Sequence, residues 1–110
     1  MIINLTGTEG CTIYQNLGVV DPGKEDQIAI KELLNTRTVE TVKELEYRAK
    51  QIMIAAILCS EEDVPEKALI DGDSLLMRFL EMELKDKGIK PMYAFRSKDN
   101  EEEISLIESA

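Results

Sequence analysis

The sequence predicts an α/β fold, a small three-layer domain of the Rossmann-like kind with a mainly parallel sheet of three to five strands. The first observation behind this is the segment 67–97, which reads as strand, turn, helix, turn and strand. Two strands joined by a helix are expected to be parallel, with a right-handed crossover. The second is composition, because 110 residues with 44% hydrophobic and 32% charged residues fit one folded domain over residues 1–110.

The first third of the chain predicts two strands and a helix. Residues 2–6 are apolar and β-prone and stop at a turn with two glycines, which predicts a strand buried on both faces. Residues 11–17 are ambiguous. Val19 and Val20 predict an edge strand, closed by an Asp-Pro-Gly turn. The apolar spacing over residues 24–34 predicts a short amphipathic helix.

The middle of the chain contains the clearest helix signal. Thr41 and Glu44 have the spacing of a capping box, and apolar residues follow at intervals of three and four up to Cys59. The second half of this helix is apolar nearly all round, so that end should lie under the sheet or against another subunit. Burial within the monomer is the favoured interpretation, and the polar segment 60–66, which contains a proline, predicts a loop.

The last third contains the strand, helix and strand unit. Residues 67–70 predict a strand, and residues 74–87 predict a helix that ends at Gly88. Residues 92–95 predict the next strand, 98–103 a charged loop, and 104–107 an edge strand that returns antiparallel to 92–96. The buried face of the helix is expected to carry Leu75, Leu76, Phe79, Leu80 and Leu84.

Composition excludes several classes of function. The chain has no histidine, which excludes histidine-based acid–base catalysis, Ser-His and Cys-His nucleophiles, and histidine metal ligands. A net charge of −9 works against binding long nucleic acids but leaves a small nucleotide open as a ligand. The longest apolar run, 52–59, is too short to span a membrane, so we expect a cytoplasmic protein without membrane contact. Cys11 and Cys59 are then expected to be reduced thiols.

Polar residues follow three of the predicted strands and should meet at one edge of the sheet. Hydroxyl groups, a glycine, a helix N-terminus and a guanidinium are the parts of an anion or phosphate cradle. Ligands of open α/β sheets bind at this carboxyl edge. The candidate ligand-binding residues are Thr6, Gly7, Thr8, Gly72, Asp73, Ser74, Arg96 and Ser97.

Each of these residues also has an ordinary structural interpretation. Asp73 or Ser74 is a normal N-cap, and Gly72 is a normal turn glycine. Asp71 and Asp73 oppose phosphate binding unless a cation such as Mg²⁺ intervenes; apart from that case we expect no cofactor and no metal site. The absence of G-x-x-x-x-G-K-[ST] and G-x-G-x-x-G patterns argues against nucleoside triphosphatases and dinucleotide oxidoreductases. Cys11 is interpreted as a small buried filler in preference to a nucleophile.

Three segments carry a family resemblance: Met-Ile-Ile-Asn-Leu-Thr at 1–6, Leu-Gly-Val-Val-Asp-Pro at 17–22, and Gly-Ile-Lys-Pro-Met-Tyr-Ala-Phe at 88–95. With them the chain resembles short prokaryotic and phage proteins that are similar in size and layout to small CRISPR-associated proteins of Rossmann-like fold. The resemblance implies a nucleotide ligand, such as a cyclic oligoadenylate that is bound or cleaved. The family pattern has Gly-Gly, small residues and Pro where this chain has Asp-Gly-Asp-Ser, so only Gly72 carries over.

Two hypotheses of function follow. The first is a protein that binds a nucleotide or another anionic small ligand at the carboxyl edge of the sheet, with weak phosphodiesterase activity left open and no catalytic residue assigned. The alternative is a non-enzymatic homodimeric interaction protein. Its interface would be the apolar end of the helix over 41–59 or the edge strand at 104–107.

Overall fold

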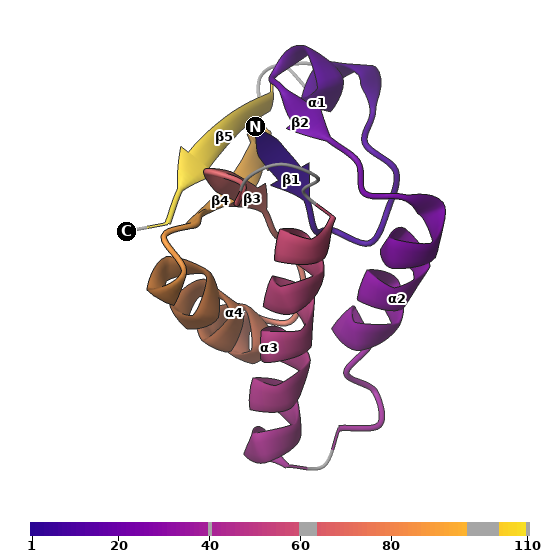
Figure 1. Cartoon of the computed structure of the whole chain (residues 1–110), viewed down its shortest axis with the longest axis vertical. Helices are drawn as coiled ribbons and strands as arrows, with labels where there is room; N and C mark the ends of the chain where they lie inside the picture. Colours follow the sequence, from indigo (N-terminus) through magenta and orange to yellow (C-terminus); the bar gives the residue numbers. More distant parts are fainter. Residues whose placement is uncertain (40, 60–63, 97–103, 110) are drawn as a thin grey trace.

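Five strands form one sheet in the order β2-β1-β3-β4-β5 in the computed structural model (Figure 1). The structure describes residues 1–39, 41–59, 64–96 and 104–109. β1 pairs in parallel with β2 and β3, and β3 pairs in parallel with β4. β5 pairs with β4 in the antiparallel sense, so the sheet is mixed. The strands are β1 (Ile2–Asn4), β2 (Val19–Val20), β3 (Lys67–Leu69), β4 (Lys90–Arg96) and β5 (Ile104–Glu108).

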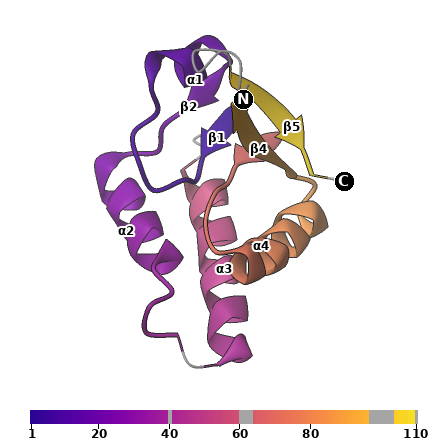
Figure 2. The ribbon, with the colours of Figure 1, turned by 180° about the vertical axis from the view of Figure 1, so that it is seen from behind.

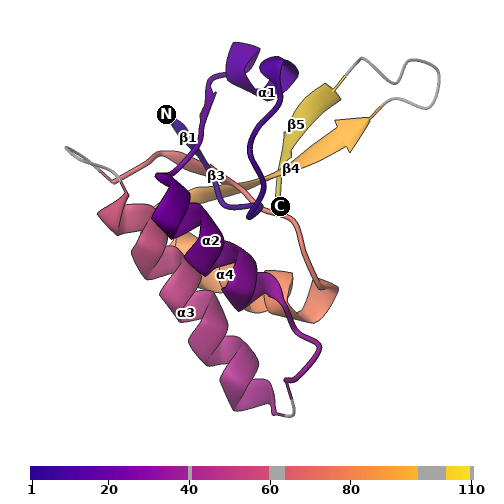
Figure 3. The same cartoon turned by 90° about the vertical axis from the view of Figure 1, so that its right-hand side faces the viewer.

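The helices are distributed unequally over the two faces of the sheet. Figure 3 shows α2, α3 and α4 together on one side and the short α1 on the other. α3 lies between α2 and α4, as the views from the front and from behind agree (Figures 1 and 2). The helices are α1 (Thr12–Asn16), α2 (Lys24–Leu34), α3 (Val42–Leu58) and α4 (Ser74–Asp86). In the part of the chain that the structure describes, none of them is long and apolar enough to cross a membrane.

Apolar side chains of the helices and of one sheet face form the main core. α3 buries Leu45, Ala49, Ile52, Met53 and Ala56, at the three- and four-residue spacing of one helix face. β1 and the residue after it add Ile3 and Leu5, and β3 and the residue after it add Ala68 and Ile70. The long helices therefore bury their apolar faces against one another and against this face of the sheet.

The buried face of α4 differs from the sequence prediction at two positions. Leu76, Leu80 and Leu84 are buried as expected, and Met77 is buried with them. Leu75 is 40% exposed, and Phe79 is only partly buried. Successive helix residues are rotated by about 100°, so a face centred on Leu80 that includes Met77 turns Leu75 toward solvent. The hydrophobic pattern placed this face correctly only to within one residue.

Polar groups fix both ends of the connection between α2 and α3. The Thr41 side chain accepts a hydrogen bond from the backbone N–H of Glu44 at 3.2 Å, as the capping signal predicts. The Arg48 guanidinium pairs with the Glu44 carboxylate at 3.1 Å. It also donates to the backbone carbonyls of Glu32, Leu33 and Asn35, at the end of α2. Arg48 thereby satisfies carbonyls that a helix end leaves without partners.

Most predicted elements are confirmed. They include the edge strand at 19–20, the helix at 24–34, and the antiparallel return of β5 along β4. The ambiguous segment 11–17 contains α1, and much of the predicted loops at 60–66 and 98–103 lies outside the described residues. The apolar end of α3 is not covered all round, because Leu58 is 77% exposed.

Candidate ligand-binding site at the carboxyl edge of the sheet

The chain leaves β1 and β3 toward opposite edges of the sheet. β1 leads through α1 to β2 on one side, whereas β3 leads through α4 to β4 on the other side. Pairing continues past the strand ends, since Leu5 N donates to Leu69 O and Ile70 N donates to Met92 O, both at 2.9 Å. The predicted adjacency is confirmed for the ends of β1 and β3, whereas β4 continues beyond this point to Arg96. Crevices at such a point of open α/β sheets are where ligands bind.

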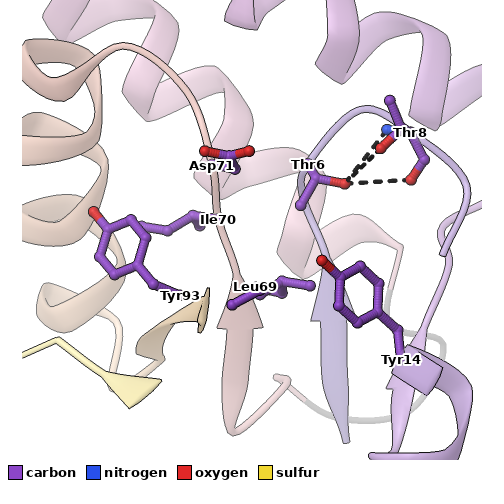
Figure 4. Close-up of a pocket in the computed structure, with 8 residues that line it drawn as sticks. Thr6, Thr8, Tyr14, Leu69, Ile70, Asp71 and Tyr93 are labelled. Carbon is purple, nitrogen blue, oxygen red and sulfur yellow. Dashed lines mark hydrogen bonds between the residues drawn. The ribbon is translucent and has the colours of Figure 1, made fainter. Parts of the chain in front are cut away.

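A pocket of about 450 Å³ lies at this point (Figure 4). Its size is within the range of small-molecule sites. Residues that follow β1 and β3 form its middle, α1 contributes a tyrosine on one side, and β4 contributes a tyrosine on the other. The residues that line it are Thr6, Thr8, Tyr14, Leu69, Ile70, Asp71, Tyr93 and Ala94. We call it the strand-edge pocket.

The buried side chain of Asn4 organises the loop that follows β1. It is 1% exposed. Its Nδ2 group donates to the backbone carbonyl of Thr8 and to Oδ1 of Asp21, both at 2.8 Å. Both partners accept hydrogen bonds, which fixes the orientation of the amide and leaves Oδ1 as an acceptor. Oδ1 then receives the Thr6 N–H at 3.0 Å and the Thr6 hydroxyl at 2.7 Å.

The Asp21 carboxylate, just after β2, holds the other end of the same loop. The backbone N–H of Gly10 donates to its two oxygens at 3.0 and 3.1 Å. A Cβ atom at Gly10 would lie 2.9 Å from Asp21 Oδ1, so the close approach requires glycine. The loop is thus fastened to β1 through Asn4 and to the end of β2 through Asp21. It is shaped before any ligand arrives.

Burial raises the pKa of Tyr93 from 10.0 to about 12, with further contributions from Glu81 and Asp71. Glu81 acts through its charge and through a hydrogen bond with the Tyr93 hydroxyl, and Asp71 acts through its charge alone. The Tyr93 hydroxyl therefore stays protonated at neutral pH. The same charges place a negative potential at this side of the strand-edge pocket.

The structure brings only part of the predicted residue set to the pocket. Thr6 and Thr8 line it. Gly7 is buried against α2 and has a φ of 78°. A Cβ atom added at Gly7 would lie only 3.0 Å from Lys31 Cα, so both the backbone conformation and the close approach require glycine. Gly7 therefore has a packing role. Gly72, Asp73 and Ser74 are exposed residues at the start of α4 and are not among the lining residues.

The N-terminus of α4 is capped by its own side chain. The Asp73 carboxylate accepts from the N–H groups of Leu75 and Leu76 at 3.0 and 3.2 Å. These are donors that a bound anion would use. Asp73 is thus the N-cap of α4, and the N–H groups of Leu75 and Leu76 already donate to its carboxylate.

The Arg96 backbone lies in β4, two residues beyond Ala94, which lines the pocket. There it pairs with Ile104 in the β4–β5 hairpin, which projects away from the helices in Figure 3. Ser97 lies outside the described residues.

Sequence reasoning missed four residues that shape the site. Tyr14 lies in the ambiguous segment 11–17, and Tyr93 lies within the predicted strand at 92–95, so neither position carries a signal of a site. Asn4 carried a weak signal, a polar residue inside an apolar strand run, which is typical of a buried hydrogen-bonding role. Asp21 was interpreted only as a turn residue, because its partner Gly10 is eleven positions away.

The two cysteines are free. Cys11 is exposed at the start of α1, so the prediction that it is a small buried filler is wrong. The five-residue helix α1 has no buried residue against which Cys11 could pack. Burial, a hydrogen bond with Asp26 and the charge of that aspartate raise the pKa of Cys59 to about 11. The Cys59 thiol is therefore protonated at neutral pH and a poor nucleophile.

Comparison with protein-family models, curated proteins and solved structures finds no match. The resemblance to CRISPR-associated proteins stays a prediction. Within the described residues, no three cysteine, aspartate or glutamate side chains are placed to share a metal ion. The function is therefore inferred from the geometry of the site.

Replacing Asn4 with alanine should destabilise the protein. The substitution removes the hydrogen bonds of the buried amide to its partly buried partners, which costs about 1–3 kcal/mol. Chemical denaturation should show this loss, and hydrogen exchange should show faster exchange of the Gly10 amide. Asn16→Ala, at an exposed position in α1, is the matched control and should leave both unchanged. Equal stabilities of the two variants would contradict the role assigned to Asn4.

The raised pKa of Tyr93 predicts a stability change at alkaline pH. The folded state holds the phenol proton more tightly than the unfolded state, whose pKa is near 10.0. This contribution to stability is complete below pH 10 and is lost as the pH rises toward 12. Phenolate absorbance of wild type and Tyr93→Phe should coincide at pH 10 and separate near pH 12, and Glu81→Gln should lower the pH of separation. Separation already at pH 10 would rule out the assigned environment.

Proposed function

We propose that this protein binds a small molecule and that the strand-edge pocket is its site. The observation that carries the proposal is that residues at the ends of β1 and β3, residues within β4 and a tyrosine of α1 line one pocket at the point where the chain connections diverge. A loop held in place by Asn4 and Asp21 forms one wall. Such prior ordering lowers the entropic cost of binding.

The strand order supports a Rossmann-like assignment of the domain. Four strands in the order β2-β1-β3-β4 follow the pattern of doubly wound α/β domains, and β5 is added as an antiparallel edge. A nucleotide or another anionic ligand remains the ligand class expected from the sequence. Asp71 lines the pocket without a described lysine or arginine beside it, so a phosphate would require a cation such as Mg²⁺.

A thermal-shift screen tests the proposal. The panel contains nucleosides, nucleotides with and without Mg²⁺, cyclic oligoadenylates and small amines, each at millimolar concentration. A ligand that binds only the native state must raise its melting temperature. Tyr14→Ala should reduce the shift at least severalfold, because it removes one wall of the pocket. Tyr47→Ala, at an exposed tyrosine of α3, should not. The proposal would be overturned if no compound raised the melting temperature, or if both variants reduced the ligand-induced shift equally.

A second candidate function is homodimerisation through a groove between α3 and α4. The groove, about 400 Å³ in volume, has an apolar floor that includes Ile54, Ile57 and the 77% exposed Leu58. Its rim carries both signs of charge, Lys50 and Lys87 together with Glu83 and Asp86. Two copies related by a twofold axis can therefore place opposite charges against each other.

Light scattering at high micromolar concentration tests the dimer. The wild type should show twice the monomer mass, and Leu58→Asp should be monomeric because a carboxylate in the apolar groove would be desolvated. Ile28→Asp, at a 60% exposed isoleucine of α2, is the matched control and should still dimerise. Salt should strengthen the dimer, since it screens the repulsion between two chains of net charge −9. A monomeric wild type at every salt concentration would exclude this candidate.

A further inference from the structure

The hydrogen-bond donors of the strand-edge pocket are largely used within the protein. Asn4 Oδ1 is an acceptor, so the proton of the Thr6 hydroxyl points to it across 2.7 Å. Thr6 Oγ1 and Thr8 Oγ1 are 3.2 Å apart. Because the Thr6 proton is already engaged, Thr8 is the donor in this pair. The oxygen of Thr8, which is exposed, keeps its lone pairs for a ligand.

Negative charge also lies on the β4 side of the pocket. The charges of Glu81 and Asp71 both contribute to the raised pKa of the Tyr93 hydroxyl, so both carboxylates lie near it. Asp71 adds two carboxylate oxygens at the exposed mouth. Neither Asp71 nor Glu81 belongs to an ion pair within the described part of the chain.

The pocket therefore presents acceptors and negative charge. Its described lining includes no lysine and no arginine, and the hydroxyl groups of Tyr14 and Tyr93 are the groups that could donate. Figure 4 shows Asp71 between Thr6 and the Ile70–Tyr93 side of the pocket, with Tyr14 on the far side of Leu69. Apolar carbon from Leu69, Ile70 and Ala94 separates the polar groups. Two phenol rings add surfaces that attract cations.

We propose that the strand-edge pocket takes a small organic cation, an ammonium group on an apolar or aromatic body. The ammonium protons would bind the Asp71 carboxylate, and the body would lie on the apolar lining. This inference rests on the proposed function and specifies its ligand class. The proposed ligand class also distinguishes this pocket, whose acceptors face the ligand, from a phosphate-binding site, whose donors face the ligand.

Three probes of matched size test the proposal. Benzylamine, benzyl alcohol and benzoate share one ring and differ in charge at neutral pH. Each is titrated into the isotopically labelled full chain at constant ionic strength, and amide shifts are followed by NMR. Benzylamine should shift the amides of Thr8, Asp71 and Tyr93 in a saturable way. It should bind at least about tenfold tighter than benzyl alcohol, because a hydrogen bond to a charged group is the stronger kind.

Asp71→Asn is the decisive variant, and it should remove the advantage of benzylamine over benzyl alcohol. Glu46→Gln removes the same single charge at an exposed position of α3 and should preserve that advantage. If both variants lost the affinity advantage of benzylamine equally, benzylamine would be attracted to the acidic chain in general, and the inference would be overturned. Binding of benzoate or adenosine monophosphate at the same amides without binding of benzylamine would overturn it while leaving the proposed function intact. Failure of every probe and of the ligand screen would overturn both.

Discussion

The buried amide of Asn4 is the interaction on which the candidate site depends. It sits inside β1, where an apolar residue would be expected, and exchanges hydrogen bonds with Thr6, Thr8 and Asp21. A buried polar group without partners would destabilise the fold. The loop after β1 therefore takes the one course that satisfies this amide. That course brings Thr6 and Thr8 to the edge of the strand-edge pocket.

The position of the site follows from the order of the strands. β1 and β3 are neighbours, yet the chain leaves them in opposite directions, so no crossover helix closes the space above their ends. α1 has only five residues and covers little of its side of the sheet. This unequal distribution of helices leaves the pocket open. The longer helices lie together on the other face, where they form the core with the sheet.

The electrostatic character of the pocket arises from interactions within the protein as much as from its lining. Asp71 carries the charge at the mouth, while Glu81 acts from α4 through the Tyr93 hydroxyl. Asp73 neutralises the N-terminus of α4 by capping it. A helix end that looked like an anion site in the sequence is thus closed to anions, and the carboxylate beside it favours ligands that donate hydrogen bonds.

Sequence periodicity by itself determined the helices, their approximate faces, and the alternation of strands and helices. These depend on local spacing and local capping, as at Thr41, and such signals lie within a few residues of each other. The edge location of the site also followed, because the carboxyl ends of parallel strands share one side of a sheet. Only the tertiary structure decided which of the candidate residues meet. Gly7 packs against α2 and does not line the pocket, and the fold brings Tyr14, Asp21 and Tyr93 to the site from separate elements. The direction of the hydrogen bonds at Thr6 and Thr8 depends on the orientation of the buried Asn4 amide, which is set by Asp21, 17 positions along the chain.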